Sequence, residues 1–347
     1  MTRAPLSSAA EITPGWLTEV LRRHESFAGA SVKDVAVEST SNTLLSANAK
    51  LRVTYAPAAP AGAPSRLFLK MAKGKRNEVA FYSKVAPAMT DPPVPRCFDA
   101  MFDDATGRFH ILLEDLSETH CVLTTWPLPP DFEACERILD AWARFHAGWW
   151  RDPRLGNGIG ETFNADAYAA FVAREFPRFV GSLGDRLSAE RRERCERMLA
   201  AAARIAIRQW ADRSLTLSHG DAHFWNVLYP KEGMTGGVNI IDWDNWRPAS
   251  AARDLAYMMA VHWYPERRRR FERKLLLRYQ RTLEAHGVSA YDMDALWRDY
   301  RLAVIQSIGT PLSQAVAGLP PLIWWGHLER IMLAYEDLDC EQLMSEL

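Results

Sequence analysis

Short runs of alternating hydrophobic and polar residues dominate the first third of the chain. A period of two is typical of strands with one face buried in a core. The pattern predicts five strands, at residues 31–39, 46–55, 66–72, 96–102 and 107–113. A helix over about residues 75–87 is expected between the third strand and the fourth, because Val79, Tyr82 and Val85 share one helical face. A shorter helix, capped by Thr13, precedes the first strand.

From residue 131 onward, the pattern of apolar positions is mainly helical. Asp131 is the expected N-cap of one helix, and further helices are expected over residues 188–211 and 266–286. Two brief β-like runs, at residues 227–229 and 238–241, interrupt the helical region. The second part of the chain therefore predicts a mostly helical domain with a small β insertion.

The order of these elements indicates an α+β fold with two lobes. We expect a small antiparallel β-sheet lobe over residues 1–115 and a larger, mostly helical lobe over residues 116–347. A chain of 347 residues, 48% of them hydrophobic, is large enough to form two cores. No window approaches 18 continuous apolar residues, and no apolar segment follows Met1, so we expect neither membrane spanning nor secretion.

Charge and cysteine content narrow the function classes. The chain has 42 Lys and Arg against 43 Asp and Glu, and its formal net charge of −1 supplies no field to attract nucleic acid or an anionic membrane. Its five cysteines never occur as a CxxC pair, which is typical of reduced thiols in the cytoplasm. We expect a cytoplasmic protein with a small-molecule partner and with neither a nucleic-acid nor a membrane partner; nothing in the sequence indicates the oligomeric state.

The segment with the strongest chemical signal runs from Ser218 to Asp244. In it, Asp221 precedes Asn226 by five positions, and Asp242 follows a β-like run. Phosphoryl transfer needs such groups, because divalent ions neutralise the phosphate charge while a carboxylate orients the attacking hydroxyl and accepts its proton. Asn and Asp supply the oxygen ligands that magnesium prefers. The spacing therefore suggests a phosphoryl-transfer site.

A second signal lies in the first lobe. Lys70 closes the third predicted strand, and Glu78 is one turn into the following helix, where the two side chains could pair. A lysine held by a glutamate can bind the phosphates of a nucleotide. Either residue alone is typical of a solvated surface charge. Both signals, in this order along one chain, favour a nucleotide site.

With these motifs the chain resembles the aminoglycoside phosphotransferase and choline kinase-like superfamily, and is most similar to the ecdysteroid-kinase-like small-molecule phosphotransferases. The similar segments are HGDAHFWNVL, IIDWD, FLKMAKGKRNEVAFY and ILLEDL, and the resemblance covers nearly the whole chain. It implies a protein-kinase-like bilobal fold and an ATP-dependent O-phosphotransferase that uses Mg²⁺, with GTP as an alternative to ATP. The acceptor would be a hydroxyl of a small molecule: an antibiotic such as an aminoglycoside, a sterol-like or lipid-like alcohol, or an amino-alcohol.

The resemblance also implies a role for each matching residue. Asp221 would be the catalytic base, and Asn226 and Asp242 would be the magnesium ligands. Lys70, anchored by Glu78, would bind phosphate. Further nucleotide contacts would come from Ser41, Asn42, Glu114, Leu116 and His223. Asp254 matches a structural position, and His219 is expected to be a packed histidine that supports the catalytic loop.

Departures from the protein kinases leave other functions open. The turn over residues 39–46 has no glycine, Asp242–Asp244 replaces the DFG triplet, and no APE segment follows, so a protein substrate is disfavoured. One alternative is a catalytically silent nucleotide-binding protein. A second is a metallohydrolase, with His219, Asp221 and His223 as metal ligands.

Three other features bear on ligands. The acidic C-terminal tail could bind a cationic acceptor, although such tails are usually solvated. Four tryptophans could line an aromatic acceptor pocket: Trp246, Trp263, Trp324 and Trp325. For the last three, burial in the helical core is the alternative. The arginine run at residues 267–270 is expected on the solvated face of an amphipathic helix rather than on a nucleic-acid surface.

Overall fold

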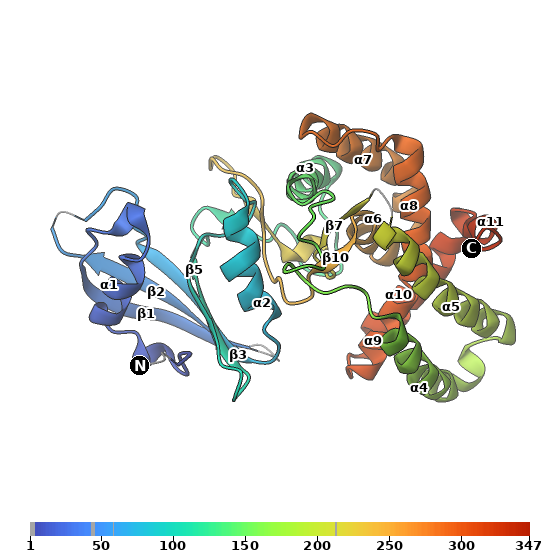
Figure 1. Cartoon of the computed structure of the whole chain (residues 1–347), viewed down its shortest axis with the longest axis horizontal. Coiled ribbons are helices and arrows are strands. Elements are labelled where there is room, and N and C mark those ends of the chain that lie inside the picture. Colours follow the sequence, from blue (N-terminus) through green and yellow to red (C-terminus); the bar gives the residue numbers. More distant parts are fainter. Residues whose placement is uncertain (1–3, 43–45, 58, 212–213) are drawn as a thin grey trace. The chain divides into compact units, whose positions relative to one another are not determined.

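The computed structural model describes residues 4–42, 46–57, 59–211 and 214–347, and the chain divides into two compact units (Figure 1). Unit 1 consists of Met1–Val122 and Leu228–Asp244, and unit 2 of Leu123–Val227 and Asn245–Leu347. This division differs from the predicted lobe boundary at residue 115, because the segment 228–244 belongs to unit 1. Strand β6 (His120–Cys121) pairs with β8 (Val227–Pro230), and β9 (Asn239–Ile240) completes a small three-stranded sheet.

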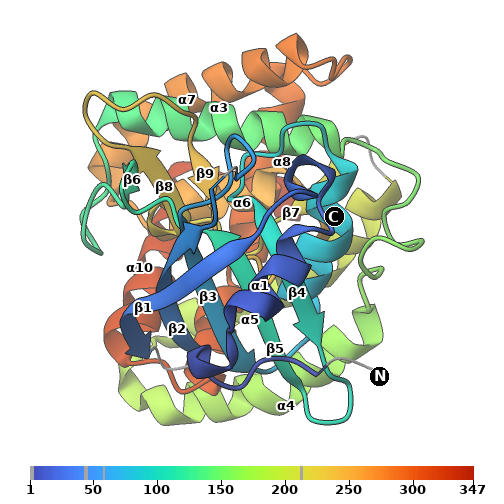
Figure 2. The same cartoon turned by 90° about the vertical axis from the view of Figure 1, so that its left-hand side faces the viewer.

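A five-stranded antiparallel sheet forms the centre of unit 1 (Figure 2). Its strands, in the spatial order β1-β2-β3-β5-β4, are β1 (Val32–Asn42), β2 (Ser46–Tyr55), β3 (Arg66–Lys73), β5 (Arg108–Glu114) and β4 (Cys97–Phe102). All five predicted strands are present. Strand β1 runs three residues beyond the predicted end, into the turn predicted at residues 39–46. Residues 43–45 of that predicted turn lie outside the described part of the chain.

The two faces of this sheet are covered by different helices. Helix α1 (Pro14–Leu21), capped by Thr13, packs on the face that carries Leu67 and Leu69 of β3. Because side chains alternate along a strand, Lys70 lies on the opposite face. Figure 1 shows α1 on one side of the sheet and α2 (Asn77–Ala80) on the other. The alternation therefore directs Lys70 toward α2.

The helix predicted over residues 75–87 is present but irregular. After α2 it continues as a π-turn, Phe81–Val85, and a 3₁₀ turn, Ala86–Ala88. Its buried face includes Val79, Tyr82 and Val85, as predicted. Other 3₁₀ turns in the described residues are Ala9–Glu11, Glu25–Phe27, Gly184–Arg186 and Phe224–Asn226.

Unit 2 is mainly helical. Its helices are α3 (Phe132–Gly148), α4 (Ala165–Leu183), α5 (Ala189–Ala211), α6 (Ala252–Ala256), α7 (Pro265–Ala285), α8 (Met293–Gln306), α9 (Gly309–Val316), α10 (Pro321–Asp337) and α11 (Cys340–Met344). The predicted helices after Asp131 and over residues 188–211 and 266–286 are confirmed as α3, α5 and α7. A π-turn, Tyr257–Val261, extends α6. Two four-residue strands that the pattern did not predict, β7 (Leu215–Ser218) and β10 (Arg247–Ser250), pair antiparallel.

The prediction for the arginine run is wrong at one position. Arg269 and Arg270 are exposed, as expected, but Arg268 is only 1% exposed. Its guanidinium donates to the Glu272 carboxylate at 3.1 Å and also pairs with Asp337 at the end of α10. Two carboxylates from two helices can neutralise a buried arginine, and sequence periodicity does not report this contact.

Arginines of unit 2 also neutralise most of the acidic tail. Four tail carboxylates form ion pairs with unit 2 arginines: Glu336 with Arg194, Asp337 with Arg268, Glu341 with Arg197, and Glu346 with Arg298. These carboxylates are therefore engaged within the unit, which weakens the case for the tail as a binding site for a cationic acceptor. No helix in the described ranges combines the length and the apolar character needed to span a bilayer.

Candidate active site

Unit 1 brings together three of the predicted site residues: Lys70, Glu78 and Asp242. The Lys70 Nζ lies 2.7 Å from Glu78 Oε2 and 2.7 Å from Asp242 Oδ1. Glu78 is only 3% exposed, whereas the Asp242 side chain is 43% exposed. Glu78 thus holds the lysine from the buried side, and Asp242 meets it from the solvent side.

The charges in this cluster shift the pKa values of both partners. Burial alone would lower the pKa of Lys70, but the carboxylates of Glu78 and Asp242 outweigh it and raise that pKa above its usual range. Burial raises the pKa of Glu78 to about 7, against the opposing attraction of Lys70. Lys70 is therefore a cation at neutral pH, while Glu78 gains and loses its proton near neutrality.

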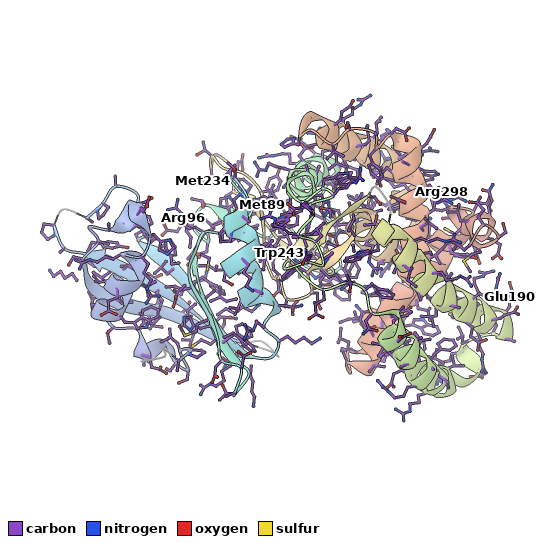
Figure 3. All side chains as sticks on the ribbon, in the orientation of Figure 1. Met89, Arg96, Glu190, Met234, Trp243 and Arg298 are labelled. Atoms are coloured by element: carbon purple, nitrogen blue, oxygen red, sulfur yellow. The ribbon has the colours of Figure 1, made fainter. Side chains whose placement is uncertain are left out.

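Trp243 anchors the Asp242 segment within unit 1. Its ring stacks on Phe81 with a centroid separation of 3.9 Å and an interplanar angle of 6°, and its Nε1 donates to the Ile240 carbonyl at 3.1 Å. Figure 3 labels Trp243 near helix α2. Asp242 itself has a φ of +67°, a conformation that costs free energy in a non-glycine residue. The buried tryptophan therefore helps to hold Asp242 in an unfavourable backbone conformation.

In unit 2, Asp254 holds the start of the predicted catalytic loop. Its carboxylate accepts hydrogen bonds from Ser218 Oγ at 2.8 Å and from the backbone N–H groups of His219 at 2.8 Å and Gly220 at 3.1 Å. His146 Nε2 of α3 lies 3.1 Å from the same carboxylate. Burial would raise the pKa of Asp254, but His146 and His219 hold it below its usual value. These contacts agree with the structural role expected for Asp254.

Gly220 allows the turn that leads to the predicted base. Its φ is +82°, and a Cβ at this position would lie 2.5 Å from the backbone oxygen of Asn245. Only glycine fits such a close backbone approach at a positive φ. His219, fully buried, accepts a hydrogen bond from Asp221 N–H on Nδ1 at 3.2 Å, which agrees with its expected role as a support for the loop.

Three side chains surround the carboxylate of Asp221. The Tyr257 hydroxyl donates to Oδ1 at 2.6 Å, and Asn226 Nδ2 donates to Oδ2 at 3.2 Å and to the Asp221 carbonyl at 3.0 Å. His223 Nε2 lies 3.5 Å from Oδ2. Sequence reasoning found Asp221, Asn226 and His223 but missed Tyr257. The available signal was spacing, since Tyr257 follows Asp254 by three positions on a helical segment.

Each unit carries a hard oxygen group of the kind that magnesium prefers. In unit 2, Asn226 donates through Nδ2, and no residue in the described ranges donates to its Oδ1. In unit 1, the Asp242 carboxylate is 43% exposed. Magnesium sites on phosphate substrates typically use one or two protein oxygens, with phosphate and water supplying the others. The described residues contain no cluster of three His, Cys, Asp or Glu side chains that could hold a metal by themselves.

The predicted nucleotide contacts in the sheet of unit 1 lie at two places. Ser41 and Asn42 are exposed at the end of β1, where they pair with Asn48 and Ala47 of β2. After β5, Glu114 N–H donates to the Arg96 carbonyl at 2.8 Å.

Two residues after β5, the carbonyl of Leu116 accepts hydrogen bonds from the backbone N–H groups of Thr119 and His120. The N–H of Leu116 has no acceptor in the described part of the chain. Leu116 therefore offers a backbone donor of the kind that binds a nucleotide base.

The tryptophans divide between core and partly exposed positions. Trp263 is buried and stacks on Phe224 with centroids 5.6 Å apart, and Trp246 is also buried. Trp324 and Trp325 are half-buried, at a centroid separation of 6.2 Å. The core alternative therefore holds for Trp263, and Trp246, which we expected at an acceptor pocket, is buried as well.

The fold and these residues define a kinase-like protein built from an antiparallel sheet lobe and a helical lobe. The chain matches the family described as "Phosphotransferase enzyme family" over residues 60–291, which is more than half of its length. It therefore belongs to this family of phosphotransferases. No curated protein matches the chain.

Solved structures share the fold at low sequence identity. A choline/ethanolamine kinase family protein from Mesorhizobium loti is 14% identical, with a TM-score of 0.54 and coverage of 95% of this chain and 97% of that chain. A thermostable mutant of an aminoglycoside phosphotransferase, in ternary complex with ADP and hygromycin B, is 14% identical, with a TM-score of 0.53 and coverage of 93% and 98%. The family match confirms the predicted superfamily, and these similarities confirm the kinase-like α+β fold.

Proposed function

We propose that this protein transfers the γ-phosphoryl group of ATP to a hydroxyl group of a small molecule in the cytoplasm. The observation that carries the proposal is the position of Lys70, whose ammonium bridges the buried Glu78 and the exposed Asp242. A nucleotide phosphate can replace Asp242 at the solvent side of Lys70 while Glu78 keeps the lysine in place. GTP remains the alternative donor, because no described feature separates the two bases.

The nucleotide would contact residues on three segments of unit 1. Lys70 would bind phosphate, and the free N–H of Leu116, with the backbone near Glu114, would bind the base. Ser41 and Asn42 would lie over the phosphates, where hydroxyl, amide and backbone N–H groups replace the usual glycine-rich loop. These roles follow the family pattern position by position.

Asn226 and Asp242 would hold Mg²⁺ through Oδ1 and a carboxylate oxygen. The ion would neutralise charge on the phosphate oxygens during transfer. Asp221 would orient the acceptor hydroxyl and take its proton, and Tyr257 and Asn226 would keep its carboxylate in one orientation. His223, close to the same carboxylate, would orient the transferring phosphate.

The direct test is Mg²⁺-dependent ATP consumption with a panel of hydroxy compounds. The panel should contain aminoglycosides, amino-alcohols, sterol-like alcohols and hydroxy acids, with product formation followed by mass spectrometry. We expect transfer to at least one compound, and none by the D221N variant. ATP binding without transfer to any compound would favour a catalytically silent nucleotide-binding protein.

A further inference from the structure

A small cavity lies beside the catalytic loop of unit 2. Its volume is about 40 Å³, and its lining includes Gly220, Arg247, Arg253, Tyr257 and Thr310. Tyr257 also donates its hydroxyl proton to Asp221. One side chain therefore contributes both to the wall of the cavity and to the setting of the proposed base.

Two arginines at this cavity, Arg247 and Arg253, form no ion pair in the described residues, although the charge of Asp254 acts on both. Arg253 makes no hydrogen bond or ion pair, and Arg247 donates only to the backbone oxygen of Asn245, at 3.3 Å. Other arginines of this unit, such as Arg191 with Glu329, form ion pairs. Arg253 is partly buried, whereas Arg247 is exposed. A partly buried guanidinium without an ion pair is unfavourable, and a bound anion would stabilise it.

Asp254 lines the same cavity but forms no ion pair with these arginines, because its oxygens accept from Ser218, His219 and Gly220 and contact His146. Its charge offsets only part of the cost of burying Arg253. Burial and the neighbouring charge of Arg247 lower the pKa of Arg253 to about 10, against the opposing attraction of Asp254, so Arg253 is still a cation at neutral pH. The Thr310 hydroxyl, also at the cavity, has no partner in the described chain. Two cations and a hydroxyl therefore face one small space.

The aromatic side chains that pack next to Tyr257 add no negative charge. The Tyr257 ring lies 5.0 Å from the His262 ring, which in turn lies 4.7 Å from the His327 ring. Burial lowers the pKa of His262 well below its usual value and that of His327 to about 4, so both are neutral at pH 7. The next cation, Arg330, has no carboxylate partner in the described residues and packs over Tyr264. A polycationic acceptor would find few counter-charges among these side chains.

We propose that the Arg247–Arg253 cavity binds an oxyanion group carried by the acceptor, which makes the acceptor a hydroxy compound with a carboxylate, sulfate or phosphate group. Guanidinium groups bind such oxyanions through charge-assisted hydrogen bonds. An anion held here would anchor a small molecule at a cavity whose wall includes Tyr257, the side chain that donates to Asp221. This inference rests on the proposed function, because it takes Asp221 as the group that receives the acceptor hydroxyl.

The first experiment uses inorganic sulfate as the probe. Sulfate binding to the full chain is measured by calorimetry at constant ionic strength, with chloride as the balancing ion. We expect sulfate to bind, R253Q to weaken binding at least tenfold, and R253K to retain more of it. R191Q is the matched control, since it removes an arginine that already has a carboxylate partner. A K70A variant removes any sulfate bound at the proposed nucleotide site and should leave the Arg253-dependent binding intact.

The second experiment asks whether the anion belongs to the acceptor. Among hydroxy compounds in the panel, we expect those with an oxyanion group to be preferred. With such an acceptor, R253Q should lower kcat/KM at least tenfold without changing KM for ATP, and sulfate should compete with the acceptor.

The inference would be overturned if sulfate did not bind, or if it bound the R253Q variant as tightly as the wild-type protein. It would also be overturned if the preferred acceptor were cationic or neutral and its phosphorylation were unaffected by R253Q. Arg253-dependent sulfate binding together with no phosphoryl transfer to any compound would instead overturn the proposed function, and it would leave the anion site standing.

Discussion

The carboxylate of Asp221 is fixed by neighbours of different kinds. Tyr257 donates to one oxygen, Asn226 donates to the other, and His223 lies near the second. Each contact restricts rotation of the carboxylate and leaves it able to accept a proton. The arrangement suits a group that must hold a hydroxyl in line with a phosphoryl group.

Replacement of Asp221 by Asn should remove the proton acceptor and keep the side chain's size. We expect kcat to fall by about a thousandfold or more, while nucleotide affinity changes only a few-fold. Steady-state kinetics and equilibrium binding of ADP separate the two effects. D185N, at an exposed position, is the control and should retain full activity. Normal turnover by D221N would rule out Asp221 as the base.

Tyr257 should act as a positioning residue for Asp221. Y257F removes the phenol hydroxyl and keeps the ring, so we expect kcat to fall about tenfold with KM for ATP unchanged. The matched control is Y335F, which removes a similar hydrogen bond from a phenol to Glu341 at 2.6 Å. Equal losses in both variants would show a general effect on stability instead.

Glu78 should make the free energy of unfolding fall as pH rises, which is the opposite of the usual effect of a carboxylate. Burial raises the pKa of Glu78 to about 7 in the folded chain, from about 4.5 for an exposed glutamate, so the folded state binds the proton more tightly. The wild-type protein should therefore lose stability, by up to about 3 kcal/mol, as pH rises from 4.5 through 7, and E78Q should lack this loss. Urea unfolding of both proteins at pH 5 and pH 8 measures the difference. A constant difference would mean that Lys70 keeps Glu78 ionised throughout.

At the scale of elements, the catalytic loop depends on contacts that hold its backbone. Asp254 on α6 accepts from two consecutive N–H groups of the loop, and Gly220 passes close to the backbone of Asn245. The loop therefore owes its conformation to residues that follow it in the sequence.

The close approach at Gly220 can be tested with a pair of glycines. G220A should destabilise the protein by at least about 2 kcal/mol, because the new Cβ would clash with the Asn245 oxygen at a positive φ. Gly233 also has a positive φ, of +75°, but a Cβ there would meet nothing within 4 Å. G233A should therefore cost only about 1 kcal/mol. Equal free energies of unfolding for the two variants, measured in urea, would contradict this explanation.

Elements differ in how well the hydrophobic pattern predicts them. Long or strongly periodic segments, such as β1, β2, α5 and α7, were predicted within a few residues. The four-residue strands β7 and β10 were missed, because a segment of four residues is too short to show a clear alternation of hydrophobic and polar positions. Arg268 was misplaced because its burial depends on Asp337, which belongs to another helix.

At the scale of the whole molecule, the proposed nucleotide site should couple to stability. A ligand that binds only the folded chain stabilises it by RT ln(1 + [L]/Kd), about 2.7 kcal/mol at a hundredfold excess over Kd. We expect ADP with Mg²⁺ to raise the free energy of unfolding of the full chain, and K70A to reduce this gain by at least about 1.4 kcal/mol, a tenfold loss of affinity. Denaturant titrations with and without nucleotide measure both values. An identical gain in K70A would remove Lys70 from the nucleotide site.

The near-zero net charge of the whole chain helps to identify the cations that could bind a ligand. The 42 basic and 43 acidic side chains largely cancel through local pairs, as in the tail, where unit 2 arginines neutralise four carboxylates. Cations that form no ion pair in the described residues, such as Arg253, therefore indicate where an anionic ligand would bind.

The amino-acid sequence by itself determined the order of most elements and the α+β class, and it supplied the candidate residues on which the proposed phosphoryl transfer rests. These features depend on periodicity and spacing within short segments, which the sequence displays directly. Only the tertiary structure decided which distant residues meet: Lys70 with Asp242, 172 positions apart, and Tyr257 with Asp221, 36 positions apart. The tertiary structure likewise decided which arginines form no ion pair. Such contacts arise from the packing of many elements at once, and no local pattern encodes them.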